Sequence, residues 1–154
     1  EVLGEHPGVA FFTLGQRRGL GFAHSQPMYV VDIQPERNVV VVGEEAAIYT
    51  RELFAEEVNW VGISDLVGPK EVMARVRYRM TAATATAYPE PDGKMRVVFD
   101  EPQRAITPGQ SVVLYEDDLL LGGGIVTATE RSQRVEDGLT ENTAAAPPDL
   151  VGVA

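Results

Sequence analysis

Residues 99–126 read FDEPQRAITPGQSVVLYEDDLLLGGGIV and hold the strongest fold signals of the chain. Thr107–Gln110 predicts a tight turn, because proline presets the first central dihedral of a type II turn and glycine supplies the positive φ of the second. Residues 111–115 and 119–126 then predict two strands joined by an acidic turn. The three glycines at 122–124 remove every side chain where a strand must bend or another backbone must approach. The local residues fit a purely structural hairpin, and such a hairpin closes a small barrel.

The composition limits the class of protein. The chain has 154 residues, of which 44% are hydrophobic, enough to bury a core as one domain or as two small ones. It has no apolar run of about eighteen residues for a membrane span, and its first residues lack the basic and apolar parts of a signal peptide. We therefore expect a soluble, cytoplasmic protein without a membrane partner. The first residue is not Met, which indicates a fragment or a processed chain.

Cysteine, histidine and charge exclude several kinds of site. The absence of cysteine excludes disulfides, thiolate metal sites and a cysteine nucleophile within this chain. His6 and His24 are too few for a histidine-built zinc site, so we expect no metal. No nucleophile elbow and no dinucleotide-binding glycine fingerprint occur, so no catalytic residue and no cofactor site are predicted here. The formal charge of −10 opposes non-specific binding of nucleic acid, so local clusters must carry any RNA affinity.

The first part of the chain predicts a small β-rich domain over residues 1–55. Residues 27–33 and 38–42 are rich in β-branched residues and flank a turn cluster, which indicates a hairpin. Residues 8–13, GVAFFT, predict a further short strand. After the hairpin, residues 43–47 are expected to form a short helical turn.

A glycine-rich loop is predicted at residues 14–21, where Gln16, Arg17 and Arg18 lie among three glycines. Its backbone amides are suited to contact a phosphate, with the two arginines adding charge. Its spacing differs from that of the phosphate-cradling loop that ends in Lys-Ser/Thr. An ordinary strand-connecting loop is the simpler interpretation of these residues.

The second part of the chain predicts a barrel. Short strands separated by turn signals indicate a six-stranded-type antiparallel β-barrel over residues 56–130. Residues 131–154 have few aromatic residues and no period of two or 3.6, which predicts a flexible tail. The expected fold class is therefore mainly β, with a small β-rich domain, a β-barrel and a C-terminal tail.

Residues 71–79, EVMARVRYR, alternate more clearly than any other segment. Every second residue belongs to an inward face: Val72, Ala74, Val76 and Tyr78. The opposite face carries three arginines: Arg75, Arg77 and Arg79. At the rise of a strand these arginines are about 6.6 Å apart, close to the roughly 6 to 7 Å between phosphates of an extended nucleic-acid strand. The row therefore fits a set of phosphate contacts. The alternative is a solvated face whose arginines pair with acids on neighbouring strands.

Four motifs follow one another along the chain: GEHPGVAFFTLGQRRGLGF, then PMYVV with NVVVV, then RVRYR, then VVFDEPQRAITPGQSVVLYEDDLLLGGGIV. In this order and at these intervals they resemble the carboxyl-terminal half of the tRNA-specific 2-thiouridylases, long labelled tRNA (5-methylaminomethyl-2-thiouridylate) methyltransferases. The match covers about residues 4–127, and its most specific parts are TLGQRRGLG and the pair AITPGQ and LGGGI. The resemblance implies a central domain of a few strands followed by a β-barrel.

The resemblance also implies a reaction. In that family the whole enzyme replaces the 2-oxygen of the wobble uridine of certain tRNAs with sulfur: ATP adenylates the base carbonyl, a cysteine persulfide delivers the sulfur, and AMP leaves. Adenylation is needed because a carbonyl oxygen is a poor leaving group, and sulfur attack needs a low-pKa cysteine. The ATP loop and the family's cysteines belong to an amino-terminal domain. This chain is thus expected to grasp tRNA and to be inactive alone, with three partners: tRNA, the ATP-binding catalytic domain, and a sulfur-relay protein or cysteine desulfurase.

Some of the family's RNA contacts can be carried over residue by residue. The arginine and tyrosine of RYR and the glutamine of TPGQ correspond here to Arg77, Tyr78 and Gln110. The charge pattern adds two phosphate contacts: Arg75 and Arg79. In the first domain three residues are candidates to approach the tRNA or the catalytic domain: Gln16, Arg17 and Arg18. The alternative function is a stand-alone β-barrel for protein interaction or RNA binding, without a catalytic role.

Overall fold

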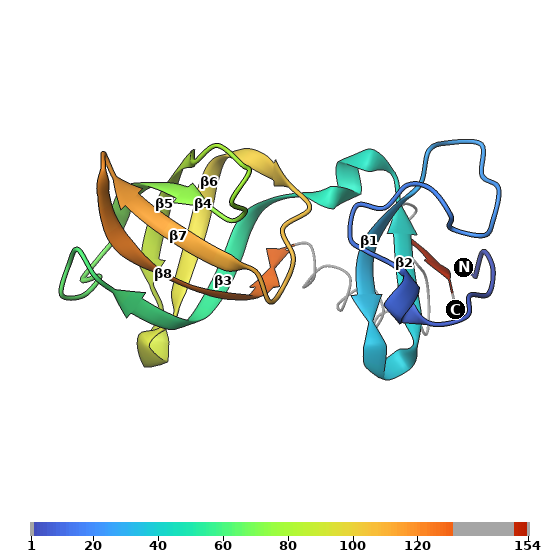
Figure 1. The fold of residues 1–154 in the computed structure, drawn as a ribbon, viewed down its shortest axis with the longest axis horizontal. Coiled ribbons are helices and arrows are strands. Elements are labelled where there is room, and N and C mark those ends of the chain that lie inside the picture. Colours follow the sequence, from blue (N-terminus) through green and yellow to red (C-terminus); the bar gives the residue numbers. More distant parts are fainter. Residues whose placement is uncertain (1, 131–149, 154) are drawn as a thin grey trace. The chain divides into compact units, whose positions relative to one another are not determined.

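A computed structural model of the chain describes residues 2–130 and 150–153 (Figure 1). The chain divides into two compact units: one contains the residues up to Tyr49 and the strand at 150–153, and the other is Thr50–Glu130. Of the flexible tail predicted for residues 131–154, the segment 131–149 and residue 154 lie outside the described residues, whereas residues 150–153 form a strand instead of a tail. In the part of the chain that is described, no helix is long and apolar enough to cross a membrane.

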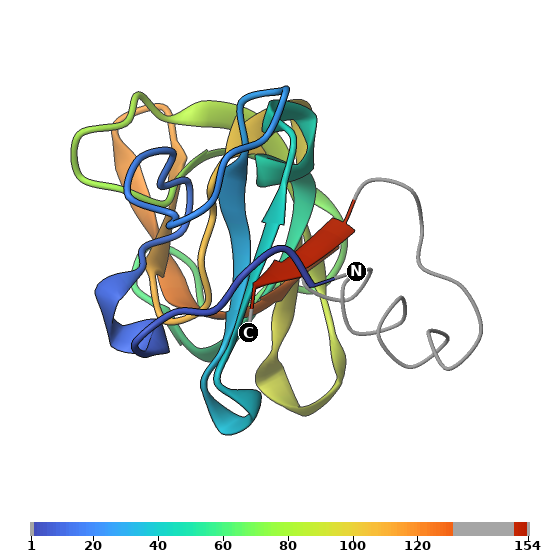
Figure 2. The same cartoon turned by 90° about the vertical axis from the view of Figure 1, so that its right-hand side faces the viewer.

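The first unit contains a three-stranded antiparallel sheet in the order β1-β2-β9. Its strands are β1 (Tyr29–Gln34), β2 (Val39–Gly43) and β9 (Leu150–Val153). Figure 2 shows β9 beside β2, as their pairing requires. The predicted hairpin is confirmed, and its turn is the 3-10 helix η2 (Pro35–Arg37). The short helical turn expected after it is the 3-10 helix η3 (Glu45–Ile48).

The strand predicted at residues 8–13 is wrong. This segment contains the 3-10 helix η1 (Val9–Phe11), and the N–H of Val9 donates to Oδ1 of Asn38 (3.3 Å) instead of to a neighbouring strand. Val9 and Phe12 pack on the core of the first unit, whereas Phe11 is exposed. The segment is therefore apolar because it covers the sheet. A covering segment and a strand can have the same composition.

Both faces of the β1–β2 hairpin are covered, which explains its runs of consecutive valines. One face packs in a cluster of five buried residues: Leu20, Met28, Val30, Val40 and Val42. The other face packs in a cluster of four: Tyr29, Val31, Val41 and Ile48. A strand that is buried on both faces needs no polar alternation, because successive side chains both point away from water.

The second unit is a closed barrel of six strands in the order β3-β6-β5-β4-β7-β8 (Figure 1). Its strands are β3 (Tyr49–Trp60), β4 (Lys70–Arg75), β5 (Ala83–Pro89), β6 (Met95–Arg104), β7 (Ser111–Glu116) and β8 (Leu119–Thr129). The 3-10 helix η4 (Pro91–Gly93) joins β5 to β6. The predicted antiparallel barrel is confirmed, and its closure removes the free edges that a small open sheet would expose.

Along β4, β5, β6 and β7 the barrel core consists of alternate residues. On β6 these are Met95, Val97 and Phe99, all buried. Ala85 of β5 lies opposite Phe99 in the ladder, so a small residue leaves room for the bulkiest of the fully buried side chains. This pairing of large and small residues fills the narrow interior of a small barrel.

The three glycines at 122–124 let β8 lie very close to both of its neighbours. A Cβ on Gly122 would overlap the carbonyl oxygen of Asn59 in β3, and one on Gly123 would overlap that of Val112 in β7. A Cβ on Gly124 would lie 2.8 Å from the carbonyl oxygen of Glu56. The close backbone approach predicted from the glycines is therefore confirmed.

Candidate functional site

The three arginines predicted as one row lie at the end of β4 and in the turn after it. β4 ends at Arg75, and the N–H of Met80 donates to the carbonyl of Arg77 (3.0 Å), which closes a turn. The strand predicted over residues 71–79 is therefore wrong at its end, and so is the even spacing of its arginines. The reason lies in the topology: β5 begins at Ala83 and pairs back on β4, so the chain must reverse between the two strands.

Each of the three arginines has a different environment. Arg75 donates from Nη2 to the hydroxyl of Tyr115 (3.0 Å), and its guanidinium carbon lies 5.5 Å from the centre of that ring. Arg77 donates to the carbonyl of Ala105, and Arg79 is exposed. None of the ion pairs found between described residues includes these arginines. The alternative, in which neighbouring acids neutralise the row, thus has no support in that part of the chain.

Tyr78 projects into solvent. The alternation predicted an inward side chain, but Tyr78 is 92% exposed, so that prediction is wrong. Val76 is the last residue that follows the alternation, and it is buried. Beyond it the chain turns, and the rule of opposite faces no longer applies. An exposed tyrosine between Arg77 and Arg79 presents an aromatic face with cations on both sides of it in sequence.

Thr107–Gln110 forms the predicted tight turn. The N–H of Gln110 donates to the carbonyl of Thr107 (3.2 Å), and Gly109 has the left-handed φ of +90° that the turn needs. Two hydrogen bonds with Val126 attach the turn to β8: Gly109 N–H to the Val126 carbonyl (2.7 Å) and Val126 N–H to the Gln110 carbonyl (2.8 Å). The side-chain Oε1 of Gln110 accepts from the N–H of Thr107 (3.1 Å). Its Nε2 donates to no group in the described part of the chain.

One carbonyl joins Arg77 to this turn. The oxygen of Ala105 accepts from Nη2 of Arg77 and from Oγ1 of Thr107 (3.3 Å), and Thr107 is itself bonded to Gln110. Ala105 is buried and has a left-handed φ of +52°, which a residue with a Cβ adopts only when its surroundings hold it there. We call Arg77, Tyr78, Ala105, Thr107 and Gln110 the barrel corner.

The first unit contains the same turn at Thr13–Gln16. The N–H of Gln16 donates to the carbonyl of Thr13 (3.0 Å), and the N–H of Thr13 donates to Oε1 of Gln16 (3.0 Å). Gly15 has a φ of +78°, and two hydrogen bonds with Val30 attach the turn to β1. Here, however, Nε2 of Gln16 donates to the carbonyl of Arg18 (2.8 Å). Both polar ends of the Gln16 side chain are therefore used within its own loop.

Arg17 and Arg18, the other predicted contacts of this loop, are exposed. Neither forms an ion pair with another residue that the structure describes. Their charges are therefore available at the surface of the first unit.

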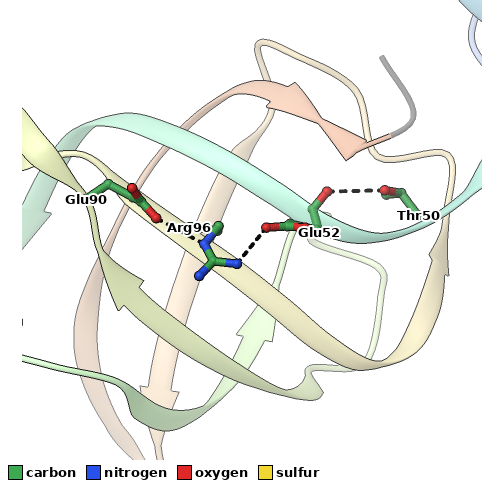
Figure 3. Close-up of polar contacts among 4 residues, drawn as sticks. All are labelled: Thr50, Glu52, Glu90 and Arg96. Atoms are coloured by element: carbon green, nitrogen blue, oxygen red, sulfur yellow. Dashed lines mark hydrogen bonds and ion pairs between the residues drawn. The ribbon is translucent and has the colours of Figure 1, made fainter. Parts of the chain in front are cut away.

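Elsewhere on the barrel an arginine is neutralised. Arg96 of β6 donates to the carboxylates of Glu52 (2.8 Å) and Glu90 (3.0 Å), as Figure 3 shows. Its guanidinium carbon also lies 4.5 Å from the centre of the Tyr88 ring. The hydrogen bond to Glu52 raises the pKa of Arg96 despite partial burial, so its charge stays fixed. In the same figure Oγ1 of Thr50 donates to the main-chain oxygen of Glu52 (3.2 Å). This cluster stabilises the barrel wall and has little charge left for a ligand.

Sequence reasoning missed two partners of the arginines, Ala105 and Tyr115, and the bond of Thr107 Oγ1 to the Ala105 carbonyl. The pattern T-x-G-Q, which occurs twice, is a signal that could have identified the bond between the glutamine side chain and the threonine N–H. Nothing in the sequence indicates that the carbonyl of Ala105 accepts from Arg77, because that bond depends on how the barrel closes. Over residues 2–130, no group of three or more His, Cys, Asp or Glu side chains is arranged to hold a metal ion.

Two family models match the chain. Residues 50–126 match the aminomethyltransferase beta-barrel domain, and residues 1–44 match the tRNA methyl transferase PRC-barrel domain. The first of these matches falls within the barrel unit and the second within the first unit.

Curated relatives match both units. The chain is 52% identical over 125 residues to the tRNA-specific 2-thiouridylase MnmA of Acetivibrio thermocellus and 52% identical over 125 residues to MnmA 1 of Clostridium botulinum strain Loch Maree. It is 51% identical over 128 residues to the enzyme of the same name from Desulforamulus reducens. These matches cover 81%, 81% and 83% of this chain, respectively, and 35% of each relative. The chain therefore spans about one third of the length of the relatives that it matches.

Proposed function

Because this chain belongs to the tRNA-specific 2-thiouridylase family, we propose that it is the tRNA-binding portion of an enzyme that replaces the 2-oxygen of a wobble uridine with sulfur. ATP would activate the base carbonyl and a cysteine persulfide would deliver the sulfur, both on an amino-terminal domain. Two features of this chain support that division. It has no cysteine to carry a persulfide, and it has no phosphate-cradling loop with a Lys-Ser/Thr ending. Alone, it is inactive.

The proposal rests on the geometry of the barrel corner. It offers an arginine without an acid partner in the described chain, an exposed tyrosine ring and a side-chain amide donor that no described group uses. A guanidinium has five N–H donors, so Arg77 keeps donors for a phosphate while it is bonded to Ala105. A tyrosine ring can stack on an unpaired base, and an amide can donate to a phosphate, ribose or base oxygen. These are the groups that bind a folded RNA by its backbone and its unstacked bases.

The corner is also held in place before any ligand binds. Arg77 and Thr107 share the carbonyl of Ala105, and Gln110 is fixed by its own bond to Thr107. Groups that are already ordered lose less conformational entropy on binding, which leaves more of the interaction energy for affinity. Tyr78 differs, because it is 92% exposed and makes none of the hydrogen bonds that connect the other members of the corner.

The formal charge of −10 opposes the approach of a polyanion. Screening limits that opposition, since the field of exposed acids decays over about 10 Å at 0.1 M ionic strength. At contact distance the nearby arginines dominate. We therefore expect tRNA binding by the isolated chain to be moderate and to weaken steeply with added salt.

The test measures by fluorescence anisotropy how the full chain binds an unmodified tRNA transcript with a uridine at the wobble position. The measurement is repeated at several salt concentrations. Arg77→Ala should weaken binding about tenfold and lower the salt slope by about one, because the variant cannot pair with one of the phosphates. The matched control is Arg37→Ala, which removes an exposed arginine from η2 in the first unit.

The alternative of a barrel that contacts only proteins makes the opposite forecast. In that case the chain would bind tRNA without salt dependence or not at all, and the Arg77 and Arg37 variants would behave alike. A persulfide donor, either a sulfur-relay protein or a cysteine desulfurase, is proposed as a partner of the whole enzyme, and this chain need not contact it.

A further inference from the structure

A polar groove lies beside the Thr13–Gln16 turn of the first unit. It has a volume of about 510 Å³ and is lined by ten residues of the loop that follows this turn, the first being Arg17 and the last Met28. Its polar members include Arg17, His24 and Gln26, and its buried members are Leu20 and Met28. The volume lies in the range of small-ligand sites. Because residues 23–27 are all exposed, the groove is open along one side.

The main chain of this loop has unused hydrogen-bond donors. Among the residues that the structure describes, none accepts a hydrogen bond from the main-chain N–H groups of residues 17–25. Gly19 and Gly21 have left-handed φ angles of +73° and +82°. A Cβ added to Gly21 would meet no atom within 4 Å, so the space beside it is empty. Free main-chain amides around left-handed residues are typical of concave anion-binding loops.

The charge around the groove favours an anion. No Asp or Glu occurs between Glu5 and Asp32, although the chain has 23 acidic residues. Within that acid-free segment Nδ1 of His24 accepts from the N–H of Gln26 (3.3 Å), so the neutral ring carries its proton on Nε2 and can donate from there. Arg17 adds a guanidinium without an ion-pair partner in the described chain.

The loop is also stabilised by the turn that precedes it. Nε2 of Gln16 bonds to the carbonyl of Arg18, and the turn itself bonds to Val30 of β1. Gln16 is therefore a positioning residue that holds the start of the groove against the sheet. The ligand donors come from the residues after it.

We propose that this groove binds a phosphodiester group of RNA, with Arg17, His24 and the amides around Gly19 and Gly21 as donors. The choice of a phosphate rests on the groove itself, and the choice of RNA rests on the proposed function. An open groove suits one phosphate of a chain that continues past both ends, whereas a free mononucleotide would favour an enclosed site. The site lies in the first unit and is separate from the barrel corner.

Amide NMR spectra of the full 15N-labelled chain test the proposal. Titration with the tRNA transcript should shift the Gly19 and Gly21 amides, and inorganic phosphate alone should shift the same amides at much higher concentration. Arg17→Gln combined with His24→Gln should weaken tRNA binding about threefold to fivefold for each substituted donor and lower the salt slope. Arg37→Gln, at an exposed arginine of the same unit, is the control and should leave binding unchanged. Unshifted core amides of Val30 and Val40 will verify that the variants fold.

The outcomes separate this inference from the proposed function. If Arg77→Ala weakens tRNA binding and the groove variant does not, the groove proposal fails while the proposed function stands. If phosphate or AMP shifts Gly19 and Gly21 and the tRNA does not, the site takes free anions and the RNA assignment is overturned. If the chain does not bind tRNA at all, the proposed function fails and the RNA ligand of the groove fails with it.

Discussion

The turns at residues 13–16 and 107–110 lie on two different β units, yet they have the same hydrogen bonds. In each, the glutamine N–H bonds to the threonine carbonyl, the glutamine Oε1 accepts from the threonine N–H, and a glycine with positive φ lies between them. The two copies differ at Nε2. Gln16 donates it to the carbonyl of Arg18, whereas Nε2 of Gln110 has no acceptor within the described chain. One sequence pattern thus stabilises a loop in one place and offers a donor to a ligand in the other.

The two turns also differ in the residues to which they are connected. The barrel turn is connected to Arg77 through the carbonyl of Ala105, so its free amide lies in a network with a cation. The turn of the first unit leads into a loop whose main-chain amides and Arg17 are the available donors. A side chain that matches a motif is therefore a binding candidate only if its polar atoms are not already used.

The largest expected effect is a loss of stability in the barrel unit that leaves the first unit folded. Gly123→Ala would place a Cβ onto the Val112 carbonyl, so it should destabilise the barrel by about 3 kcal/mol or more. Chemical denaturation followed by NMR should show loss of the Thr107–Gln110 signals at lower denaturant, with those of Thr13–Gln16 retained. Gly68→Ala is the control, because a Cβ at Gly68 meets nothing within 4 Å. Equal stability of the two variants would contradict the close strand approach that defines the barrel.

A smaller effect on stability is expected when the same substitution is made in each of the two turns. Gly15→Ala and Gly109→Ala each force a residue with a Cβ into a left-handed conformation, which should cost about 1 kcal/mol of unit stability. Both should lower the denaturation midpoint of their own unit by a similar amount. Gly109→Ala should also weaken tRNA binding, and by more than Gly15→Ala, whose turn only positions the loop of the groove. If Gly15→Ala weakens it as much, the barrel turn has no special role.

The smallest effect on tRNA affinity is expected at Arg96, an arginine that is neutralised by carboxylates. Arg96→Gln removes two ion pairs with carboxylates near the surface, so it should cost less than about 1 kcal/mol of barrel stability. The affinity for tRNA should stay within about twofold of the parent chain. A large loss of affinity would mean that the ion pairs of Arg96 open to admit a ligand, against the assignment of this cluster to the barrel wall.

Much of the barrel could be predicted because its signals are local. Short strand segments separated by turn signals indicated the barrel, and the Thr107–Gln110 turn depends on proline and glycine chemistry alone. Gly122–Gly124 indicated a close backbone approach for the same reason. Features that depend on a strand's own residues are visible without knowledge of its partner.

The errors have one cause in common: they depend on contacts with other segments, which the residues of one segment do not show. Alternation continues through Tyr78, but β4 stops at Arg75 because its partner strand starts only at Ala83. Residues 8–13 have the composition of a strand but no partner in the sheet, so they form η1 and a cover. The link between Arg77 and Ala105 joins residues that are 28 apart, and only closure of the barrel brings them together.

The most direct test of the central claim exchanges one amide for a carboxylate in each turn. Gln110→Glu and Gln16→Glu both keep an oxygen that accepts from the threonine N–H and both lose the Nε2 donor. We expect Gln110→Glu to weaken tRNA binding about tenfold with little change in stability, because the missing donor faces a ligand and a negative charge replaces it. We expect Gln16→Glu to cost about 1 kcal/mol of stability in the first unit and to change tRNA affinity less. The reverse pattern, or equal effects of the two changes on tRNA affinity, would contradict the different roles of the two amides.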